Sequence, residues 1–324
     1  MLITGATGFA GSHLAEALLS RGNFVLFGTG RQPSWPGELD HLAERLTYRP
    51  CDLAAGGPPL LDLLREASPD QVYHLAGYAA VGRSFREPDA AWDGNLLATR
   101  RLYEAVASWG GRPRILYVGS GLVYGEGTTS RPLDEDAPLC PASPYAASKA
   151  AADLLSYQVT RDPGLDVVRA RPFNHIGPRQ SPQFALAHFA QQLAAIEHGL
   201  RPPVLETGDL SPCRDLTDVR DTVVAYVLLM EKGRGGEVYN IASGHSVSMG
   251  DVLTRLLRLS KSRVEVRQRA DLVRPTEQHV SRADAGRLCR ETGWRPSYRL
   301  DQTLADTLEH WRRSTKQEVA INGR

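Results

Sequence analysis

Cysteine is scarce in this chain, with 4 among 324 residues. The four are far apart, so their spacing fits neither a disulfide scaffold nor a zinc site. The 9 histidines are equally dispersed, and no two stand four residues apart as a helical metal-binding pair would. These absences predict a protein without a bound metal that works in the reducing cytoplasm.

Long apolar runs and an excess of charge of one sign are also missing. No stretch approaches the roughly 18 consecutive apolar residues of a membrane helix, and no charged leader precedes an apolar segment at the N-terminus. Lys and Arg number 38 against 37 Asp and Glu, so the formal net charge is +1. Because no basic stripe is present, we expect neither a nucleic acid nor a membrane as a partner.

What the sequence does have is a glycine-rich opening. Gly5, Gly8 and Gly11 follow a short apolar run and precede apolar residues at helical spacing. Strand, turn and helix in this order are the setting of a dinucleotide fingerprint, although the spacing is G-x-x-G-x-x-G and not G-x-G-x-x-G. The glycines permit a tight turn, backbone approach to a pyrophosphate and close packing of helix on strand. Backbone N–H groups at the helix start would then face the anion.

The segment after the second predicted strand bears on the choice of cofactor. That strand, Phe24–Phe27, is followed by Arg31 and by no acid. NAD sites often carry an acid about 20 residues past the glycines, where it binds the ribose 2′-hydroxyl. Arg31 could instead meet a 2′-phosphate, so the sequence favours NADP(H), with NAD(H) as the alternative. Asp52, after a third strand, could accept a hydrogen bond from the adenine amino group.

Short apolar strands alternate with helical patterns through the first half of the chain. Strands are predicted at 72–76, 115–118 and 167–170, and helices at 90–109 and 145–161. This alternation predicts an α/β fold with a doubly wound parallel sheet (Rossmann), in which ligands bind beyond the carboxyl ends of the strands. The glycine turn and Ser120 both stand at such ends, so we expect them to share one cleft.

After Pro172 the pattern becomes irregular, with clustered proline, glycine and arginine. We therefore predict a smaller, partly interleaved α/β C-terminal lobe that closes over the substrate. The predicted division is a Rossmann domain of 1–171 plus about 216–242, a substrate lobe of about 172–215 plus 243–314, and a frayed tail of 315–324.

Tyr145 and Lys149 are four residues apart, so on a helix they share a face. An ammonium nearby, together with an oxidised nicotinamide, favours the phenolate and would bring the tyrosine pKa toward a useful acid–base range. Ser120 could hydrogen-bond the same substrate oxygen. The three predict a site where hydride reaches a carbonyl carbon and Tyr145 protonates the oxygen. The alternative, an exposed Tyr-x-x-x-Lys pair without chemistry, is disfavoured by the upstream fingerprint.

As a set, these motifs resemble those of the extended short-chain dehydrogenase/reductases that act on nucleotide sugars, the NAD-dependent epimerase/dehydratase family. The resemblance implies a Rossmann domain, a bound nicotinamide nucleotide, a nucleoside-diphosphate sugar and a homodimer built from the helices around Asn95 and Tyr145. The matching segments cover nearly the whole chain: Thr4–Gly11, Asp52–Leu53, His74–Ala76, Asn95, Ser120–Gly125, Pro144–Lys149, Arg171–Asn174, Arg274–Glu277 and Thr292–Pro296.

The resemblance also implies which residues bind. Cofactor contacts are expected at Gly5, Thr7, Gly8, Phe9, Ala10, Gly11, Arg31, Asp52, Leu53, Leu75, Ala76, Tyr145 and Lys149. Substrate contacts are expected at Ser84, Asn174, Arg214, Arg274 and Glu277, with Glu277 on the nucleoside ribose and the arginines near the diphosphate. Arg214 could instead form a surface ion pair with Asp215 or Asp218. His175 and Asn95 are predicted to pack and to hydrogen-bond within the fold.

Residue 122 separates the reactions of this family. The 4,6-dehydratases carry an acid two residues after the serine or threonine, whereas this chain has Leu122. Leucine cannot move a proton, so elimination of water is disfavoured and carbonyl reduction is retained. Three further segments resemble most the reductases of GDP-4-keto-6-deoxy-D-mannose, whose product is GDP-D-rhamnose: Arg171–Gln180, Gly199–Leu205 and Arg214–Asp221.

Three other functions remain open. A 4-epimerase would retain NAD(H) through turnover, which the absent acid near Arg31 disfavours. A 4,6-dehydratase would need a relocated acid, and residues 134–136 look like a solvated turn. A non-catalytic dinucleotide-binding module would be expected to lose Tyr145 or Lys149, and both are present. The sequence does not determine the nucleobase of the sugar donor.

Overall fold

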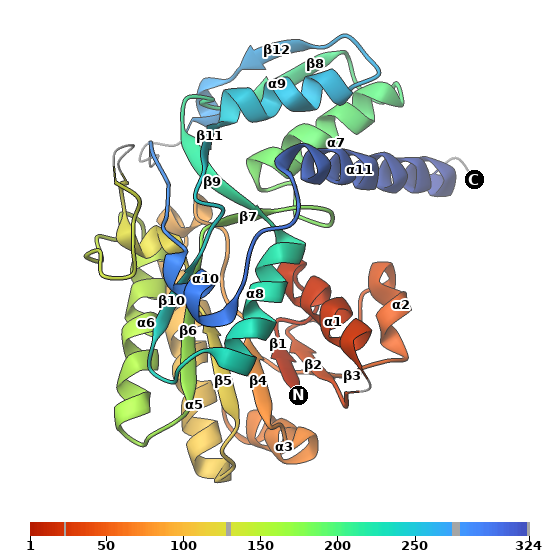
Figure 1. The fold of residues 1–324 in the computed structure, drawn as a ribbon. Coiled ribbons are helices and arrows are strands. Elements are labelled where there is room, and N and C mark those ends of the chain that lie inside the picture. The colour runs from red at the N-terminus through yellow and green to blue at the C-terminus, as the bar shows by residue number, and fades with distance from the viewer. Residues whose placement is uncertain (23, 128–130, 274–278, 323–324) are drawn as a thin grey trace.

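A seven-stranded sheet forms the centre of the computed structural model, which describes residues 1–22, 24–127, 131–273 and 279–322 (Figure 1). Its strands are β1 Leu2–Thr4, β2 Phe27–Gly30, β3 Thr47–Pro50, β4 Gln71–His74, β5 Arg114–Val118, β6 Val167–Pro172 and β10 Val238–Ile241. They are parallel and ordered β10-β6-β5-β4-β1-β2-β3. The order reverses at β1, between β2 and β4, which is where doubly wound sheets bind ligands.

Helices cover both faces of this sheet. One face carries α1 (Phe9–Arg21), α8 (Val219–Lys232) and α10 (Gly286–Thr292), and the other carries α3 (Pro58–Ala67), α5 (Ala98–Trp109) and α6 (Pro144–Arg161). Successive strand residues point to opposite faces. Leu2 thus packs with α3, α5 and α6, whereas its neighbour Ile3 packs with α1 and α8. Burial on both faces explains why the central strand β5 has the consecutive apolar residues Ile115, Leu116 and Tyr117.

A second group of elements lies beyond the carboxyl ends of the strands (Figure 1). It has its own apolar core, which includes Phe189, Leu253 and Leu304. The group contains α7 (Ala185–Glu197), β8 (Val204–Thr207), α9 (Met249–Leu259), β12 (Glu265–Gln268) and α11 (Leu300–Asn322). A small sheet in the order β11-β9-β7 is formed by β7 (Asn174–Ile176), β9 (Cys213–Asp218) and β11 (Ser246–Ser248). The predicted lobe boundaries stay a prediction.

Short helices complete the fold. They are η1 (Gly37–Leu39), α2 (Asp40–Ala43), η2 (Arg83–Phe85), α4 (Pro88–Trp92), η3 (Asp93–Leu97), η4 (Gly121–Tyr124) and η5 (Ala270–Leu272). The helix predicted at 90–109 is therefore interrupted, because η3 is a single π-helical turn between α4 and α5. Such turns often mark functional positions, and this one carries Asn95.

Two further elements differ from the sequence-based expectation. β2 begins at Phe27, not Phe24, because its register pairs Phe27 with Leu2, and Val25 is 75% exposed. The C-terminal segment, predicted to be frayed from Thr315, is instead helical in α11, where Thr315 is buried. Within the described ranges, no helix combines the length and apolarity that crossing a bilayer would require.

Candidate active site

A cavity of about 710 Å³ runs along the carboxyl ends of β1, β2, β4, β5 and β6. Its lining contains every residue predicted to catalyse or to bind the cofactor, together with Asn174. These residues are Gly5, Thr7, Gly8, Phe9, Ala10, Gly11, Arg31, Asp52, Leu53, Leu75, Ala76, Ser120, Tyr145, Lys149 and Asn174. The parallel sheet thus brings together segments that are more than a hundred residues apart in the sequence.

Ser84 and Arg214, two further predicted substrate contacts, are not among the described residues that line the cavity. Ser84 is fully buried, and its hydroxyl donates to the Val81 carbonyl oxygen at 2.7 Å and accepts from the Tyr145 backbone N–H at 3.2 Å. Its side chain therefore supports the start of α6. Arg214 is also largely buried, in β9. Arg274 and Glu277 lie outside the described residues.

The alternative of a surface ion pair at Arg214 does not fit the surroundings of its neighbours. Asp215 is fully buried and accepts hydrogen bonds from Ser243, Gly244 and Ala283. Asp218 instead pairs with Arg220 and caps the N-terminus of α8. Both acids therefore hold elements of the fold together.

The glycine turn is shaped for an anion at the start of α1. Gly5 has φ +72°, and a Cβ there would lie 2.9 Å from the Ala76 backbone nitrogen. A Cβ on Gly11 would overlap the Gly5 carbonyl oxygen, so the helix can pack here only without a side chain. Gly8 is the N-cap and offers no side-chain acceptor to the first turn. The unpaired N–H groups of that turn therefore face the cavity as an anion site.

A buried chain of hydrogen bonds holds β4 beside this turn. The Thr4 hydroxyl accepts from the Ala76 N–H at 3.1 Å and bonds the His74 Nδ1 at 2.8 Å, and His74 Nε2 bonds the Thr99 hydroxyl at 2.9 Å. Burial lowers the pKa of His74 to about 3, so the ring is neutral. The sequence marked His74 only as part of a motif, because its partners are distant in the chain.

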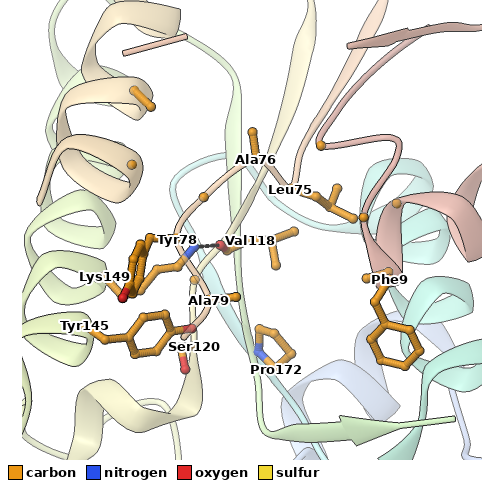
Figure 2. A pocket seen from close by; sticks show the side chains of 18 of the residues that line it. Phe9, Leu75, Ala76, Tyr78, Ala79, Val118, Ser120, Tyr145, Lys149 and Pro172 are labelled. Carbon is orange, nitrogen blue, oxygen red and sulfur yellow. Dashed lines mark hydrogen bonds between the residues drawn. The ribbon is translucent and has the colours of Figure 1, made fainter. Parts of the chain in front are cut away.

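Ser120, Tyr145 and Lys149 converge at the far end of the cavity (Figure 2). Ser120 follows β5, and its hydroxyl accepts from the Leu122 N–H at 3.2 Å. Tyr145 and Lys149 lie one turn apart on α6, and Lys149 Nζ donates to the Val118 carbonyl oxygen at 3.0 Å (Figure 2). The geometry places a phenol, a hydroxyl and an ammonium around the same part of the cleft.

The pKa values of this group differ in part from expectation. Burial raises the pKa of Tyr145, and its hydrogen bond with Ser120 opposes the rise. Burial lowers the pKa of Lys149 to about 8. The sequence predicts a lowered tyrosine pKa, but that expectation relied on a positive nicotinamide as well as on Lys149. In the protein alone, loss of hydration dominates, and the Tyr145 phenol is neutral.

Several contacts orient α6. The Ser143 hydroxyl caps the helix by accepting from the Ala146 N–H at 3.1 Å. From η3, the Asn95 amide donates to the Ser148 hydroxyl at 2.9 Å, and its oxygen accepts from the Tyr78 N–H at 3.0 Å. Asn95 thus ties α6 to the loop after β4, which supports the structural role predicted for it.

Leu122 lies on η4 and lines the cavity beside Ser120. Among the described residues, the acids in the cavity lining are Asp52 and Asp93. Asp52 follows β3, and Asp93 belongs to η3, so neither is on the turn that carries Ser120. Likewise, no cluster of three or more His, Cys, Asp or Glu in the described part of the chain could hold a metal ion.

Three residues that line the cavity carry a buried polar atom without a hydrogen-bond partner among the described residues. The Thr29 hydroxyl, the Gln180 amide oxygen and the Tyr226 hydroxyl are buried and have no partner among these residues, and all three residues line the cavity. Buried polar groups are rarely left unsatisfied in proteins. These three atoms expose almost no surface to the cavity, so the fit to a dinucleotide rests on the glycine turn.

Comparisons with known proteins identify the family and the relatives that this chain resembles. The family described as GDP-mannose 4,6 dehydratase matches residues 2–307. The chain is 34% identical to the GDP-6-deoxy-D-mannose reductase of Pseudomonas aeruginosa, over 98% of this chain and 99% of that one.

Solved structures show the same fold. The structure of RMD from Pseudomonas aeruginosa complexed with NADPH aligns with a TM-score of 0.83 at 34% identity, over 97% of this chain and 99% of that one. The UDP-glucose 4-epimerase of Thermus thermophilus in complex with NAD aligns with a TM-score of 0.86 at 29% identity, over 96% and 98% of the two chains.

Proposed function

Because the chain belongs to the GDP-mannose 4,6 dehydratase family, and is thus an NAD(P)-dependent oxidoreductase acting on a nucleotide sugar, we propose a specific reaction for it. The protein reduces the ketone of a nucleoside-diphosphate-4-keto-6-deoxy sugar. The substrate best supported is GDP-4-keto-6-deoxy-D-mannose, and the product is then GDP-D-rhamnose. The relative of 34% identity is a reductase of this sugar class by name.

The observation that carries this proposal is Leu122 beside an intact Ser120, Tyr145 and Lys149. Ketone reduction needs a hydride and one proton. Elimination of water needs an additional acid–base group at the sugar, and leucine provides none. The cleft therefore has the proton donor that ketone reduction needs. At the turn after Ser120 it lacks the additional acid–base group that dehydration needs.

Tyr145, Ser120 and Lys149 would each have a different role in proton transfer. When bound, the nicotinamide supplies the hydride. Tyr145, held neutral by burial, donates its proton to the developing alkoxide oxygen. Ser120 donates a hydrogen bond to the same oxygen and so orients the ketone. Lys149 places a positive charge one helical turn from Tyr145, which stabilises the phenolate that remains.

The adenosine end of the cavity supports NADP(H), with NAD(H) as the alternative. Gly30 ends β2, and a Cβ there would lie 3.0 Å from the Thr7 hydroxyl and 3.2 Å from the Tyr48 hydroxyl. An acidic side chain that binds a ribose diol would be crowded by these two side chains at this position. Arg31 follows directly, is exposed and lines the cavity, where a 2′-phosphate would bind its guanidinium.

The remaining assignments are proposals of the same kind. Asn174 lines the cavity and is placed at the sugar diphosphate. Arg214, Arg274 and Glu277 are kept as proposed substrate contacts. We also propose a cytoplasmic homodimer. Four free cysteines suit a reducing compartment, and Trp92, Leu154 and Tyr157 expose apolar surface on α4 and α6.

A substrate panel tests the reaction. Purified protein is mixed with GDP-, UDP-, dTDP- and CDP-linked 4-keto-6-deoxy sugars and with NADPH or NADH, and absorbance at about 340 nm is followed. The proposal expects stoichiometric loss of absorbance with the GDP sugar, and Tyr145→Phe should lower the rate by about 10²- to 10⁴-fold.

The other outcomes identify the competing functions. Changed sugar stereochemistry with persistent absorbance would indicate a 4-epimerase. Formation of a 4-keto sugar from GDP-mannose alone would indicate a dehydratase. Cofactor binding without turnover of any sugar in the panel would favour a binding module.

A further inference from the structure

The short helix η4 presents one apolar side chain to the cleft. Gly121 and Leu122 line the cavity, and Gly121 has no side chain. Val123 and Tyr124 pack instead in an apolar core with Phe173, where they are 0% and 2% exposed. Leu122 is partly exposed, so a ligand in the cavity has a surface of this side chain to contact.

Leu122 is held close to the two hydroxyl groups that are proposed to bind the ketone oxygen. Its backbone N–H donates to the Ser120 hydroxyl oxygen at 3.2 Å. The side chains of Ser120 and Tyr145 are hydrogen-bonded to each other and lie in the same part of the cleft (Figure 2). A ketone oxygen bound by both hydroxyls would therefore lie beside Leu122.

A second apolar residue, Val81, lies near the same pair in the loop after β4. Val81 lines the cavity and is partly exposed. Its carbonyl oxygen accepts from the Ser84 hydroxyl at 2.7 Å, and that hydroxyl accepts from the Tyr145 backbone N–H at 3.2 Å. Val81 and Leu122 thus lie near the catalytic hydroxyls on two different elements, and neither side chain can form a hydrogen bond.

We propose that Leu122 and Val81 form an apolar subsite for the C6 methyl group of the sugar, and that Leu122 determines the preference for a 6-deoxy sugar. This inference rests on the proposed function, because it requires the C4 ketone at Ser120 and Tyr145. C6 is two bonds from C4, so it lies near the groups that surround the ketone. A methyl group gains from apolar contact, whereas a 6-hydroxyl there would lose hydrogen bonds to water without replacement.

Two nucleotide sugars that differ by one hydroxyl group test the subsite without any variant. GDP-D-rhamnose is GDP-D-mannose without the hydroxyl on C6, and the oxidation of each by NADP⁺ is followed by the absorbance of the NADPH formed. In this reverse reaction, C4 gives a hydride to NADP⁺ and its hydroxyl gives a proton to ionised Tyr145. The kcat/KM of the wild type should be about 10- to 100-fold higher for GDP-D-rhamnose, as for a hydroxyl without a partner in an apolar pocket.

Leu122→Asn places an amide of nearly the same shape in the subsite. The amide can hydrogen-bond a 6-hydroxyl, so the preference for GDP-D-rhamnose should fall by about 10-fold, with a rise in kcat/KM for GDP-D-mannose. Leu122→Met keeps the subsite apolar and should keep the preference of the wild type.

Leu139→Asn is the matched control. Leu139 is partly buried against the same core as Val123, and it is not among the described residues that line the cavity. The variant should lower the melting temperature, because an amide replaces a packed apolar side chain, and should leave the preference between the two sugars unchanged.

The outcomes separate this inference from the proposed function. If the wild type neither reduces GDP-4-keto-6-deoxy-D-mannose nor oxidises GDP-D-rhamnose, both fail together. If the wild type interconverts these two sugars and oxidises GDP-D-mannose equally well, only the inference is overturned. An unchanged preference in Leu122→Asn would also overturn it, because the methyl group would then be recognised by other residues.

Discussion

At the scale of single residues, burial moves the pKa values of Tyr145 and Lys149 in opposite directions. The phenol is raised and the ammonium is lowered to about 8, because each loses hydration of its charged form. A neutral phenol beside a lysine that is still protonated near neutral pH is the state that proton donation to a ketone requires. The same burial that tunes the pair also destabilises the free protein.

The first prediction concerns this cost at Lys149. Its pKa is about 8 in the folded protein against an ordinary 10.5, so between these values the unfolded chain binds more protons. Stability therefore rises with pH across that window, and the penalty is fully present below about pH 8. Urea unfolding of the cofactor-free wild type and of Lys149→Met from about pH 7 to about pH 10 measures it.

The test compares the unfolding free energy of the wild type with that of Lys149→Met at each pH, because the other titrating groups are the same in both proteins. The wild type should gain stability relative to Lys149→Met as pH rises above about 8. A difference independent of pH would show that Lys149 keeps its ordinary pKa in the fold.

At the scale of elements, α6 positions the two side chains proposed for catalysis, Tyr145 and Lys149. Tyr145, Lys149 and Asp153 follow one another at four-residue spacing, so they share one face of the helix. Asp153 is fully buried and accepts from Arg169 at 2.7 Å and from Arg171 at 2.9 Å, both on β6. This ion-pair cluster holds α6 against β6, whose end lines the cavity.

The second prediction is that Asp153→Asn destabilises the protein severely. It leaves two largely buried guanidinium groups without their carboxylate, a change that costs about 3–5 kcal/mol for buried pairs. Guanidinium chloride unfolding of the cofactor-free protein measures the loss. Glu104→Gln is the control, because Glu104 pairs with Arg100 on the exposed side of α5 and such pairs contribute little. Comparable losses in the two variants would contradict a clamping role for Asp153.

At the scale of the whole molecule, the two-sided packing of the sheet leaves little apolar surface exposed on its helices. Leu154 and Tyr157 on α6 are exceptions, at 58% and 46% exposure, and Trp92 on α4 is 38% exposed. α4 and α6 pack against each other. These three side chains therefore form an apolar surface on α4 and α6, and the proposed dimer would bury that surface.

The third prediction tests that dimer. Leu154→Glu places a charge in the proposed interface and should convert the dimer to a monomer in sedimentation velocity. Leu200→Glu is the matched control, because Leu200 is 54% exposed in the loop after α7 and should leave the dimer intact. A wild type that sediments as a monomer, or a Leu154→Glu protein that stays dimeric, would contradict this interface.

Features that depend on neighbouring residues could be predicted from the sequence. The glycine turn, the alternation of strands and helices, and the Tyr145–Lys149 pair are local patterns, and the structure contains each of them. Their convergence on one cleft followed from the general geometry of parallel sheets. The start of β2 was misplaced because hydrophobicity alone does not determine pairing register.

Other features depended on contacts between segments far apart in the chain. Burial by several elements decided the direction of the Tyr145 pKa, and Ser84 turned out to support α6 from a position 61 residues before Tyr145. No sequence signal predicts that the Tyr226 hydroxyl is buried without a hydrogen-bond partner among the described residues. By itself, the sequence determined the order of the elements and the candidate residues for catalysis, because local spacing encodes both. Only the tertiary structure decided how far each side chain is hydrated and which groups it hydrogen-bonds, because both depend on packing between segments that are distant in the sequence.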